Sequence, residues 1–464
     1  MRILISRDIE IENPTTLILD WCQTNLVVDN PTWLQLYRMG KEDTIKRKHI
    51  SKELKLYTKS GDKIRIPIGC IYGIWNMIKY SEIRTSFNSC NDLSIKYSNC
   101  PLELYDYQEE ALSAALSAKS GVIVAPCGAG KTTIGIELIH RLGKKALWIT
   151  HTKSLLTQAA NDMKNLYPKL NIGYITEGKV DIGSDITIST VQTLEKVDPQ
   201  YYASEFEVII VDECHKVSGS PTFAKMFQKV LSNLNARFKY GLTATPFRAD
   251  SLTRTIYTNL GMNQKGEFEP IYTITRDKTN TLTAEHVKIE LDTEASYDFL
   301  LPDGTIDYMS LIDYLCDNEQ RNNWIIDNVM KCHEEGRKQA LLSLRVSQCK
   351  TLYDMLKEKG INAVLLTGGS TKKQREEILG NTDSWDVIIS TMSLFKEGIN
   401  IKALDCVHLC APDKNKSGVI QACGRCERVL QGKKEPKFFD YVDTKIKYCA
   451  NAYKKRVGYL KNRE

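Results

Sequence analysis

The chain has 464 residues, enough for roughly three domains of ordinary size. Its 63 Lys and Arg against 57 Asp and Glu give a net charge of +6, and its 42% of hydrophobic residues is typical of folded globular proteins, not of disordered or membrane proteins. No apolar run approaches the ~18 residues of a membrane-spanning helix, and the charged N-terminus argues against a signal peptide. Fourteen cysteines are too few for a disulfide scaffold, so we expect reduced thiols and a cytoplasmic protein.

Residues 1–100 predict a small α+β accessory domain. Isoleucines alternate along 2–12, as expected of a strand with one buried face. Turn-forming residues at 59–63 separate two short apolar segments and predict a hairpin, and the spacing of isoleucines in 71–78 predicts a helix. Segment 41–59 carries seven Lys and Arg against three acidic residues, so it is either a solvated face or a surface that contacts phosphates.

From residue 101 onward, apolar strands alternate with amphipathic helices, which predicts the α/β class with doubly wound parallel sheets. The first series of expected strands covers 121–125, 146–150, 186–189, 208–211 and 240–243. The second covers 339–344, 363–367, 387–390, 406–410 and 438–441, and further strands are expected at 272–275 and 286–292. We therefore expect two tandem α/β domains, at 101–285 and 286–464, the second ending in a basic tail.

A glycine-containing loop lies between the first expected strand of this series and a helix; its sequence is Ala125-Pro126-Cys127-Gly128-Ala129-Gly130-Lys131-Thr132-Thr133. The backbone N–H groups of such a loop converge on phosphate oxygens at the N-terminus of the helix. Lys131 is placed to reach the β- and γ-phosphates, and the Thr132 hydroxyl is placed to bind Mg²⁺. We therefore predict a site for ATP and Mg²⁺ at residues 127–133.

Two acidic residues, Asp212 and Glu213, follow the expected strand 208–211. In a parallel sheet, ligands bind at the carboxyl ends of the strands. We assign Asp212 to the water shell of the Mg²⁺ ion, and Glu213 to orienting or deprotonating the water that attacks the γ-phosphate.

A third element with phosphate chemistry lies in the second α/β domain, in the segment Gln421 to Arg428. Arg425 and Arg428 are three residues apart, so they are expected to share a helix face. Guanidinium groups stabilise the charge that develops on a transferring phosphoryl group. Their place in the second domain predicts that hydrolysis requires the two α/β domains to close on each other.

These three elements together resemble those of superfamily 2 helicases of the DExH type, and the resemblance covers about residues 101–445. The other segments that resemble motifs of this family are Tyr107-Gln108 (the adenine-reading element), 150–158 (motif Ia), 188–194 (Ic), 241–248 (III), 365–369 (IVa), 390–400 (V) and 421–428 (VI). The resemblance implies two RecA-like domains that bind ATP and Mg²⁺ between them.

The resemblance also implies roles for single residues. Gln108 is expected to read adenine, Gly398 to contact the nucleotide and Gln421 to help place the attacking water. The candidate contacts to a nucleic-acid backbone are Thr152, Thr190, Gln192, Thr367, Gly368 and Thr391. His215, Thr243 and Thr245 are expected to couple hydrolysis to strand movement without taking part in the chemistry.

Within the superfamily, the order of domains most resembles bacteriophage recombination and branch-migration DNA helicases. This implies a monomeric motor that acts on single-stranded, forked or branched DNA, away from membranes and, if viral, in the host cytoplasm. Alternatives are a double-strand translocase, an RNA helicase or transcript-release factor, and an ATP-gated nucleic-acid clamp that does not hydrolyse ATP. Segment 30–40 also resembles the front of phage members, so residues 1–100 either contact duplex or junction DNA or form a stabilising cap.

Two further patterns admit more than one interpretation. Cys406, Cys410, Cys423 and Cys426 have a spacing that resembles a zinc site, but alternation along an expected strand favours buried core thiols. Apolar residues between 446 and 460 have helical spacing and are expected to pack on the second domain. The basic residues 454–456 either contact nucleic acid or form a solvated face.

Overall fold

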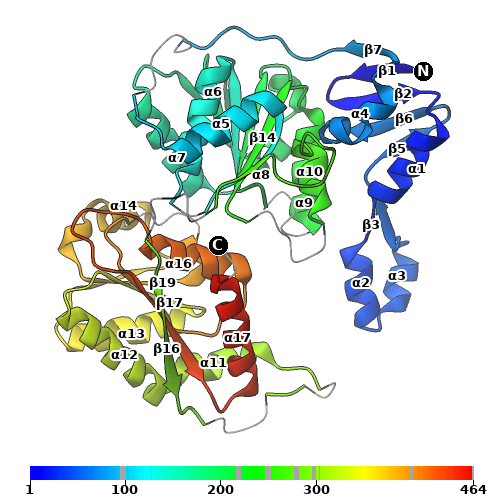
Figure 1. Cartoon of the computed structure of the whole chain (residues 1–464). Coiled ribbons are helices and arrows are strands. Elements are labelled where there is room, and N and C mark those ends of the chain that lie inside the picture. The colour runs from blue at the N-terminus through cyan, green and yellow to red at the C-terminus, as the bar shows by residue number, and fades with distance from the viewer. Residues whose placement is uncertain are drawn as a thin grey trace. The chain divides into compact units, whose positions relative to one another are not determined.

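A computed structural model of the chain describes residues 1–94, 101–126, 128–215, 221–245, 252–275, 279, 282–294, 299–301, 304–396 and 401–461. The chain divides into two compact units (Figure 1). One contains Met1–Pro126 and Gly130–Ile274, and the other contains Thr275–Glu464 with Cys127–Ala129. Within the described residues, no helix combines the length and the apolar character that a membrane span requires.

The first unit is built on a sheet that has eight strands within the described residues, in the order β11-β10-β12-β9-β13-β14-β8-β15. The strands are β8 (Ser120–Val124), β9 (Ala146–Thr150), β10 (Ile172–Thr176), β11 (Lys179–Asp181), β12 (Ile186–Thr190), β13 (Val208–Asp212), β14 (Phe238–Thr243) and β15 (Tyr272–Thr273). All pair in parallel except β11, which is antiparallel to β10. Because parallel strands end on the same edge, the residues that follow β8, β9, β12, β13 and β14 gather there.

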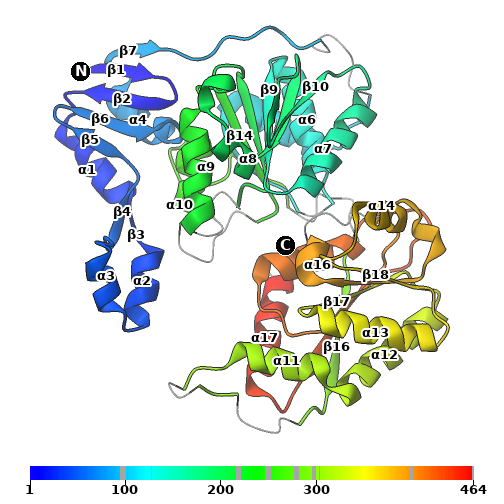
Figure 2. The ribbon, with the colours of Figure 1, turned by 180° about the vertical axis from the view of Figure 1, so that it is seen from behind.

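Helices cover both faces of this sheet, as the predicted doubly wound architecture requires. One face carries α5 (Asp106–Ala118), α6 (Lys131–Leu142) and α7 (Lys153–Leu166), and the other carries α8 (Val191–Lys196), α9 (Pro221–Asn233) and α10 (Arg254–Leu260) (Figures 1 and 2). Strands β9, β12 and β13 are buried along their whole length, which explains the continuous apolar sequences of β9 and β13. The predicted fold class is therefore confirmed for this domain.

Strand β10 was not among the predicted strands. Its sequence, Ile172-Gly173-Tyr174-Ile175-Thr176, lacks the continuous apolar run that identifies β9 and β13. A side chain at Gly173 would lie 2.0 Å from the backbone nitrogen of Gly183, so the close approach of the neighbouring turn requires glycine inside the strand. Glycine lowers the strand signal in the sequence.

The N-terminal segment forms a five-stranded sheet, counted over the described residues, in the order β5-β6-β2-β1-β7. Its strands are β1 (Arg2–Ile5), β2 (Asp8–Glu12), β5 (Thr58–Ser60), β6 (Lys63–Pro67) and β7 (Glu82–Thr85), and it packs with α1 (Thr16–Asn25) and α4 (Ile71–Ile78). The prediction of a single strand over 2–12 is wrong, because a turn separates β1 from β2. The antiparallel register pairs Ile3 with Ile11 and Ile5 with Ile9, so all four isoleucines still share one buried face.

The N-terminal sheet domain is attached to the first α/β domain through α10. Met262 N donates to Gly69 O at 2.9 Å, and Arg254 donates to the Asn25 carbonyl at 3.2 Å. A Cβ at Gly69 would lie 2.3 Å from the Tyr257 carbonyl oxygen, so the two backbones approach as closely as glycine permits. This packing accounts for their membership of one compact unit.

A pair of short helices, α2 (Pro31–Arg38) and α3 (Glu42–Arg47), extends from that domain on a two-stranded ribbon of β3 (Val27–Asp29) and β4 (Glu53–Lys55) (Figures 1 and 2). The seven Lys and Arg residues of segment 41–59 lie in α3, along the ribbon and in β5, and all are exposed. The predicted hairpin of β5 and β6 is present, with its turn at 61–62. Both interpretations of the basic segment require exposed cations, so its exposure does not choose between them.

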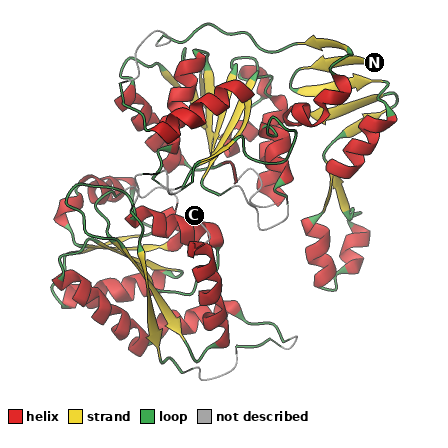
Figure 3. Cartoon of the chain, in the orientation of Figure 1, coloured by secondary structure: helices red, strands yellow, loops and turns green. Residues whose placement is uncertain are grey.

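The second unit has a parallel sheet of six described strands in the order β16-β21-β20-β17-β19-β18. Figure 3 draws the strands in yellow and the helices that pack against them in red. The strands are β16 (Glu285–Leu291), β17 (Gln339–Ser343), β18 (Ala363–Leu366), β19 (Val387–Thr391), β20 (Cys406–Leu409) and β21 (Lys437–Asp443). Helices α12 (Glu319–Glu334) and α13 (Val346–Glu358) pack on one face, and α15 (Met392–Lys396), α16 (Lys416–Cys426) and α17 (Lys447–Lys461) pack on the other. Helices α11 (Tyr308–Asp317) and α14 (Lys372–Gly380) complete the unit.

Helix α17 corrects one expectation about the basic tail. The tail is helical as predicted. Ile446, Cys449 and Leu460 are buried and Tyr453 and Val457 are half-buried, but Arg456 is buried too. Its guanidinium donates to both carboxylate oxygens of Asp440, at 2.7 and 2.6 Å, and to the Asp413 carbonyl. Arg456 therefore anchors α17 to β21, while Lys454 and Lys455 remain exposed.

This anchor predicts a large difference between neighbouring cations. Replacing Arg456 by Ala leaves Asp440 buried without its two-pronged partner, which costs about 3–5 kcal/mol of unfolding free energy. Lys454→Ala, on the exposed face of the same helix, should change it by less than about 0.5 kcal/mol. Urea unfolding followed by circular dichroism measures both, and similar losses in the two variants would contradict the assignment.

Candidate functional site

The predicted phosphate loop connects β8 to α6 in the way that its sequence indicated. Gly128 and Gly130 both adopt left-handed backbone conformations, with φ of 90° and 79°, and Gly130 caps the first turn of α6. Lys131, Thr132 and Thr133 form that first turn, and Ala129 is buried. A helix N-terminus that follows two such glycines presents backbone donors for phosphate oxygens.

Gln108 approaches this loop from helix α5. Its side chain is 5% exposed, and its Oε1 accepts a hydrogen bond from Tyr105 N at 3.1 Å, closing the first turn of α5. A Cβ at Gly130 would lie 2.5 Å from Gln108 Nε2, so the amide is packed against the loop. The structure thus brings together the predicted adenine-reading residue and the predicted phosphate loop.

The two acids lie at the carboxyl end of β13, where they were expected. Asp212 Oδ1 accepts from the backbone N of Glu213 at 2.9 Å, and Glu213 has φ of 50°, a strained value for a residue other than glycine. Glu213 Oε1 lies 3.8 Å from Lys131 Nζ. The strand end, the turn and the lysine therefore hold both carboxylates beside the phosphate loop.

Burial affects the two acids differently. Burial, together with the neighbouring charge of Glu213, raises the pKa of Asp212. Burial also disfavours the charged form of Glu213, but the positive charge of Lys131 and the contact with His215 outweigh it and hold the pKa of Glu213 well below its ordinary value. Glu213 is therefore ionised at neutral pH.

A chain of polar contacts links Glu213 to strand β14. His215 Nδ1 lies 3.3 Å from Glu213 Oε2 and 3.0 Å from Thr243 Oγ1. The Thr243 hydroxyl donates to Thr245 O and accepts from Thr245 N, at 2.9 and 3.1 Å. Because that hydroxyl hydrogen is already used, His215 must donate from Nδ1. The three predicted coupling residues thus form one connected hydrogen-bonded series.

The predicted backbone contacts of the first domain lie at the ends of β9 and β12, which are neighbours in the sheet. Thr152 and Thr190 occupy the N-cap positions of α7 and α8, and their hydroxyls accept from backbone N–H groups of those helices. Gln192 Nε2 donates to the His151 carbonyl at 2.9 Å, which ties the two segments together. This amide therefore has a structural partner that the sequence did not predict.

In the second domain, Thr367 and Gly368 follow β18, and Thr391 ends the adjacent strand β19. Thr367 N donates to the Ser370 hydroxyl at 3.0 Å, and the Arg375 guanidinium donates to the Thr367 and Gly368 carbonyls. The predicted contacts again occupy two neighbouring strand ends of one sheet. Arg375, which holds this loop, was missed because nothing in its sequence context distinguishes it from a surface cation.

The arginine segment is only partly as predicted. Gln421 and Arg425 lie on α16, but the helix ends at Cys426, so the prediction that Arg428 shares its face is wrong. The Arg425 guanidinium lies over the ring of Phe395, 5.6 Å from its centroid, and the side chain is buried. Glu427, which ends the helix, is fully buried and accepts from Ala284 N at 2.9 Å.

The four cysteines with zinc-like spacing do not form one cluster. Cys406 and Cys410 belong to the core between the second sheet and α12–α13, whereas Cys423 and Cys426 belong to the core on the opposite face. Two predicted nucleotide contacts, Cys127 and Gly398, lie outside the described residues.

Comparison with known proteins connects this geometry to families. Residues 101–248 match the family "Type III restriction enzyme, res subunit", and residues 320–429 match the "Helicase conserved C-terminal domain". The ATP-dependent DNA helicase uvsW of Enterobacteria phage T4 is 25% identical over 76% of this chain and 71% of its own length. Its crystal structure covers 100% of this chain and 98% of its own, with 17% identity and a TM-score of 0.40.

Two further relatives, both longer than the matched region, carry different names: one is named as a helicase and the other as an RNA helicase. IRC3 of Saccharomyces cerevisiae, named as an ATP-dependent helicase, is 25% identical over 73% of this chain but 51% of its own length. L396 of Acanthamoeba polyphaga mimivirus, named as an ATP-dependent RNA helicase, is 24% identical over 74% of this chain and 64% of its own length. The chain thus spans about half to two thirds of the length of these relatives.

The fold and the two family matches define a class: proteins with two tandem helicase domains, each built on a largely parallel sheet. The chain belongs to superfamily 2 of the helicases and is related to the helicases of phages.

The packing of Gln108 on the loop generates a test of the nucleotide site. A methyl group at Gly130 would displace the Gln108 amide and strain the loop, so Gly130→Ala should weaken ATP binding by at least about tenfold, or 1.4 kcal/mol. Gly178→Ala is the matched control, because Gly178 has a similar φ of 86° with nothing within 4 Å of its Cβ position. Titration with a fluorescent ATP analogue measures both, and equal affinities would contradict the site.

Proposed function

We propose that the chain is an ATP-dependent DNA helicase or translocase that unwinds or branch-migrates DNA in replication, recombination or repair. The observation that carries the proposal is the arrangement on one edge of the first sheet. There, the phosphate loop, the two acids, the coupling hydroxyl and two candidate backbone-contact segments follow five neighbouring strands in the order β12-β9-β13-β14-β8. A motor needs its nucleotide and its nucleic acid close together, and this edge would hold both.

ATP would change the partners of Lys131. In the structure, the Lys131 ammonium lies 3.8 Å from Glu213 Oε1. Phosphate oxygens in the loop would attract Lys131, so Glu213 would be left to orient and deprotonate the attacking water. Thr132 and Asp212 fit a Mg²⁺ ion, since a hydroxyl at the start of α6 and a buried carboxylate are oxygen donors that this ion accepts. The bound ion would supply charge neutralisation for the phosphates.

The second domain would contribute Gln421, Arg425 and Arg428 when the two domains close around ATP. Arg425 would then exchange the ring of Phe395 for the γ-phosphate. Cation–π contacts at buried positions are worth about 2 kcal/mol, which a charge-assisted bond to phosphate can replace. Domain closure would thereby be linked to hydrolysis.

The nucleic-acid strand would move because the two domains bind it tightly in turn. Thr152, Thr190 and Gln192 in one domain, and Thr367, Gly368 and Thr391 in the other, would hold phosphates through hydroxyl, amide and backbone groups, without reading bases. Such contacts suit a sequence-independent monomeric motor. The exposed cations of segment 41–59 would add affinity for a flanking duplex or junction.

An RNA substrate is the second candidate, favoured by the similarity to L396, which is named as an RNA helicase. The candidate contacts hold the phosphate backbone, which DNA and RNA share. A clamp that binds ATP without hydrolysing it is disfavoured, because Lys131, Glu213 and Arg425 are all present and a clamp needs none of them for turnover.

The first measurement is ATP hydrolysis with single-stranded DNA, duplex DNA, a four-way junction and RNA as stimulators. We expect branched or single-stranded DNA to raise the wild-type rate. Lys131→Ala should abolish hydrolysis, and Glu213→Gln should bind ATP but lose about 10²–10⁴-fold in rate. Lys179→Ala and Glu177→Gln change exposed residues of the same domain and should behave as wild type.

Each other outcome of this assay has a defined meaning. Stimulation of ATP hydrolysis by RNA alone would favour an RNA helicase. ATP binding with no hydrolysis under any condition would favour the ATP-gated nucleic-acid clamp. A normal rate of ATP hydrolysis in Lys131→Ala or Glu213→Gln would contradict the assignment of the ATP site.

The hydrogen-bonded series through Thr243 generates a separate prediction. Thr243→Val removes the hydroxyl that joins His215 to Thr245 without changing the shape of the side chain. We expect DNA-stimulated hydrolysis to fall less than about tenfold while strand displacement is lost, because the residue links sites and does no chemistry. The control Thr258→Val removes a buried hydroxyl on α10, away from the site. If hydrolysis and displacement fell in parallel, the coupling role would be refuted.

A further inference from the structure

We propose that the second domain holds a structural zinc ion between Cys332, Cys406 and His408. The three side chains come from α12 and β20, and their ligand atoms all lie within 4.8 Å of one another. Cys406 Sγ is 3.1 Å from His408 Nε2. Tetrahedral zinc with bonds of about 2.3 Å to sulfur and 2.0–2.1 Å to nitrogen places such donors about 3.5–3.8 Å apart, so small side-chain shifts would complete the site.

The surroundings of His408 select the nitrogen that faces the thiols. His408 Nδ1 lies 2.8 Å from the Tyr441 hydroxyl, and its ring stacks on Phe439 with centroids 4.6 Å apart. A zinc-bound histidine characteristically bonds its other nitrogen to an oxygen, which fixes the ring orientation. Tyr441 provides that oxygen, so Nε2 is directed towards the cysteines.

Gln339, on strand β17, supplies a fourth donor. Its Oε1 lies 2.9 Å from His408 Nε2, and its Nε2 donates to the Val329 carbonyl at 3.1 Å. The second bond directs the amide oxygen towards the cluster. Gln339 Oε1 and Cys406 Sγ both contact His408 Nε2, and Cys332 Sγ completes the group. Two sulfurs, one nitrogen and one oxygen make four candidate donors, which is the number of ligands that a closed structural zinc site needs.

Charge balance also fits zinc. Two thiolates and a divalent ion sum to zero, so the occupied site leaves no net charge in an apolar core. Cys332, Cys406, His408 and Gln339 are 0–3% exposed, and the core around them is formed by α12, α13 and one face of the sheet. The ion would bind α12 to β20 and β17 at the edge opposite the strand ends that carry the motor residues.

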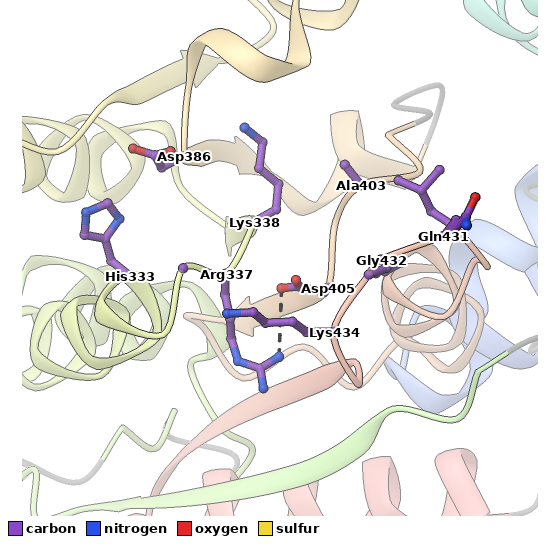
Figure 4. Close-up of a pocket in the computed structure, with 12 residues that line it drawn as sticks. His333, Arg337, Lys338, Asp386, Ala403, Asp405, Gln431, Gly432 and Lys434 are labelled. Carbon is purple, nitrogen blue, oxygen red and sulfur yellow. Dashed lines mark ion pairs between the residues drawn. The ribbon is translucent and has the colours of Figure 1, made fainter.

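A pocket of about 280 Å³ offers a path of entry at this edge (Figure 4). Its lining includes His333, Lys338 and Asp405, which are the chain neighbours of Cys332, Gln339 and Cys406. Asp405 is 5% exposed and lies 3.9 Å from Arg337. The pocket therefore reaches the ends of the same three segments that supply the donors.

The test is metal analysis of the full chain, produced in zinc-supplemented medium and then desalted. We expect about one zinc per chain by mass spectrometry, and less than about 0.1 in Cys332→Ser. Cys349→Ser removes another buried thiol of the same core and should keep its zinc. Replacing zinc by Co²⁺ should give thiolate-to-cobalt charge-transfer absorption in the wild type and in Cys349→Ser.

The cobalt spectrum keeps the test decisive where Cys332→Ser does not fold, because it is read on the wild type. Wild type that holds less than about 0.1 zinc and shows no thiolate-to-cobalt band would overturn the proposal. Full zinc in folded Cys332→Ser would overturn it as well. Metal content does not depend on ATP hydrolysis, so this result is independent of the proposed motor function.

Discussion

The constraint on which this molecule depends is that parallel strands end on the same edge of a sheet. In the first domain, that edge collects a phosphate loop after β8, two acids after β13 and hydroxyl-bearing segments after β9 and β12. The second domain repeats the arrangement at β18 and β19. Residues far apart in sequence become neighbours because strand order, rather than chain order, decides adjacency. The sheet therefore creates the site, and the helices mainly bury its faces.

Strand order also explains why β14 suits a linking role. It lies between β13, which carries the acids, and β8, which carries the phosphate loop. Its last residue, Thr243, contacts His215, which in turn contacts Glu213. These contacts are the route by which the proposed function would pass a change at Glu213 to the segment after β14. In that proposal, phosphate and Glu213 would compete for Lys131, and the change would begin with ATP.

The parts predicted from sequence are those where chemistry restricts the residues that can be used. Glycines with positive φ at 128 and 130, Lys131 and the acids after β13 have few substitutes, so their spacing was informative. Prediction failed where tertiary contacts determine the local structure. Strand β10 contains a glycine that its neighbouring turn requires, and Arg456 is buried because it forms an ion pair with Asp440. The end of α16 before Arg428 is set by Glu427, which bonds to a distant backbone group.

The cysteines are a second case in which sequence spacing does not predict which residues meet in the folded core. In sequence, Cys406 pairs most naturally with Cys410, Cys423 and Cys426. Cys410 shares the core of Cys406, but Cys423 and Cys426 lie on α16, in the core on the opposite face of the sheet. The residues that meet Cys406 are His408, two positions along the same strand face, and Cys332, which is far away in sequence and brought in by α12. Short spacing identifies metal sites in loops, where consecutive residues can fold back on one ligand. In a sheet core the ligands must come from different elements, so only the assembled structure reveals them.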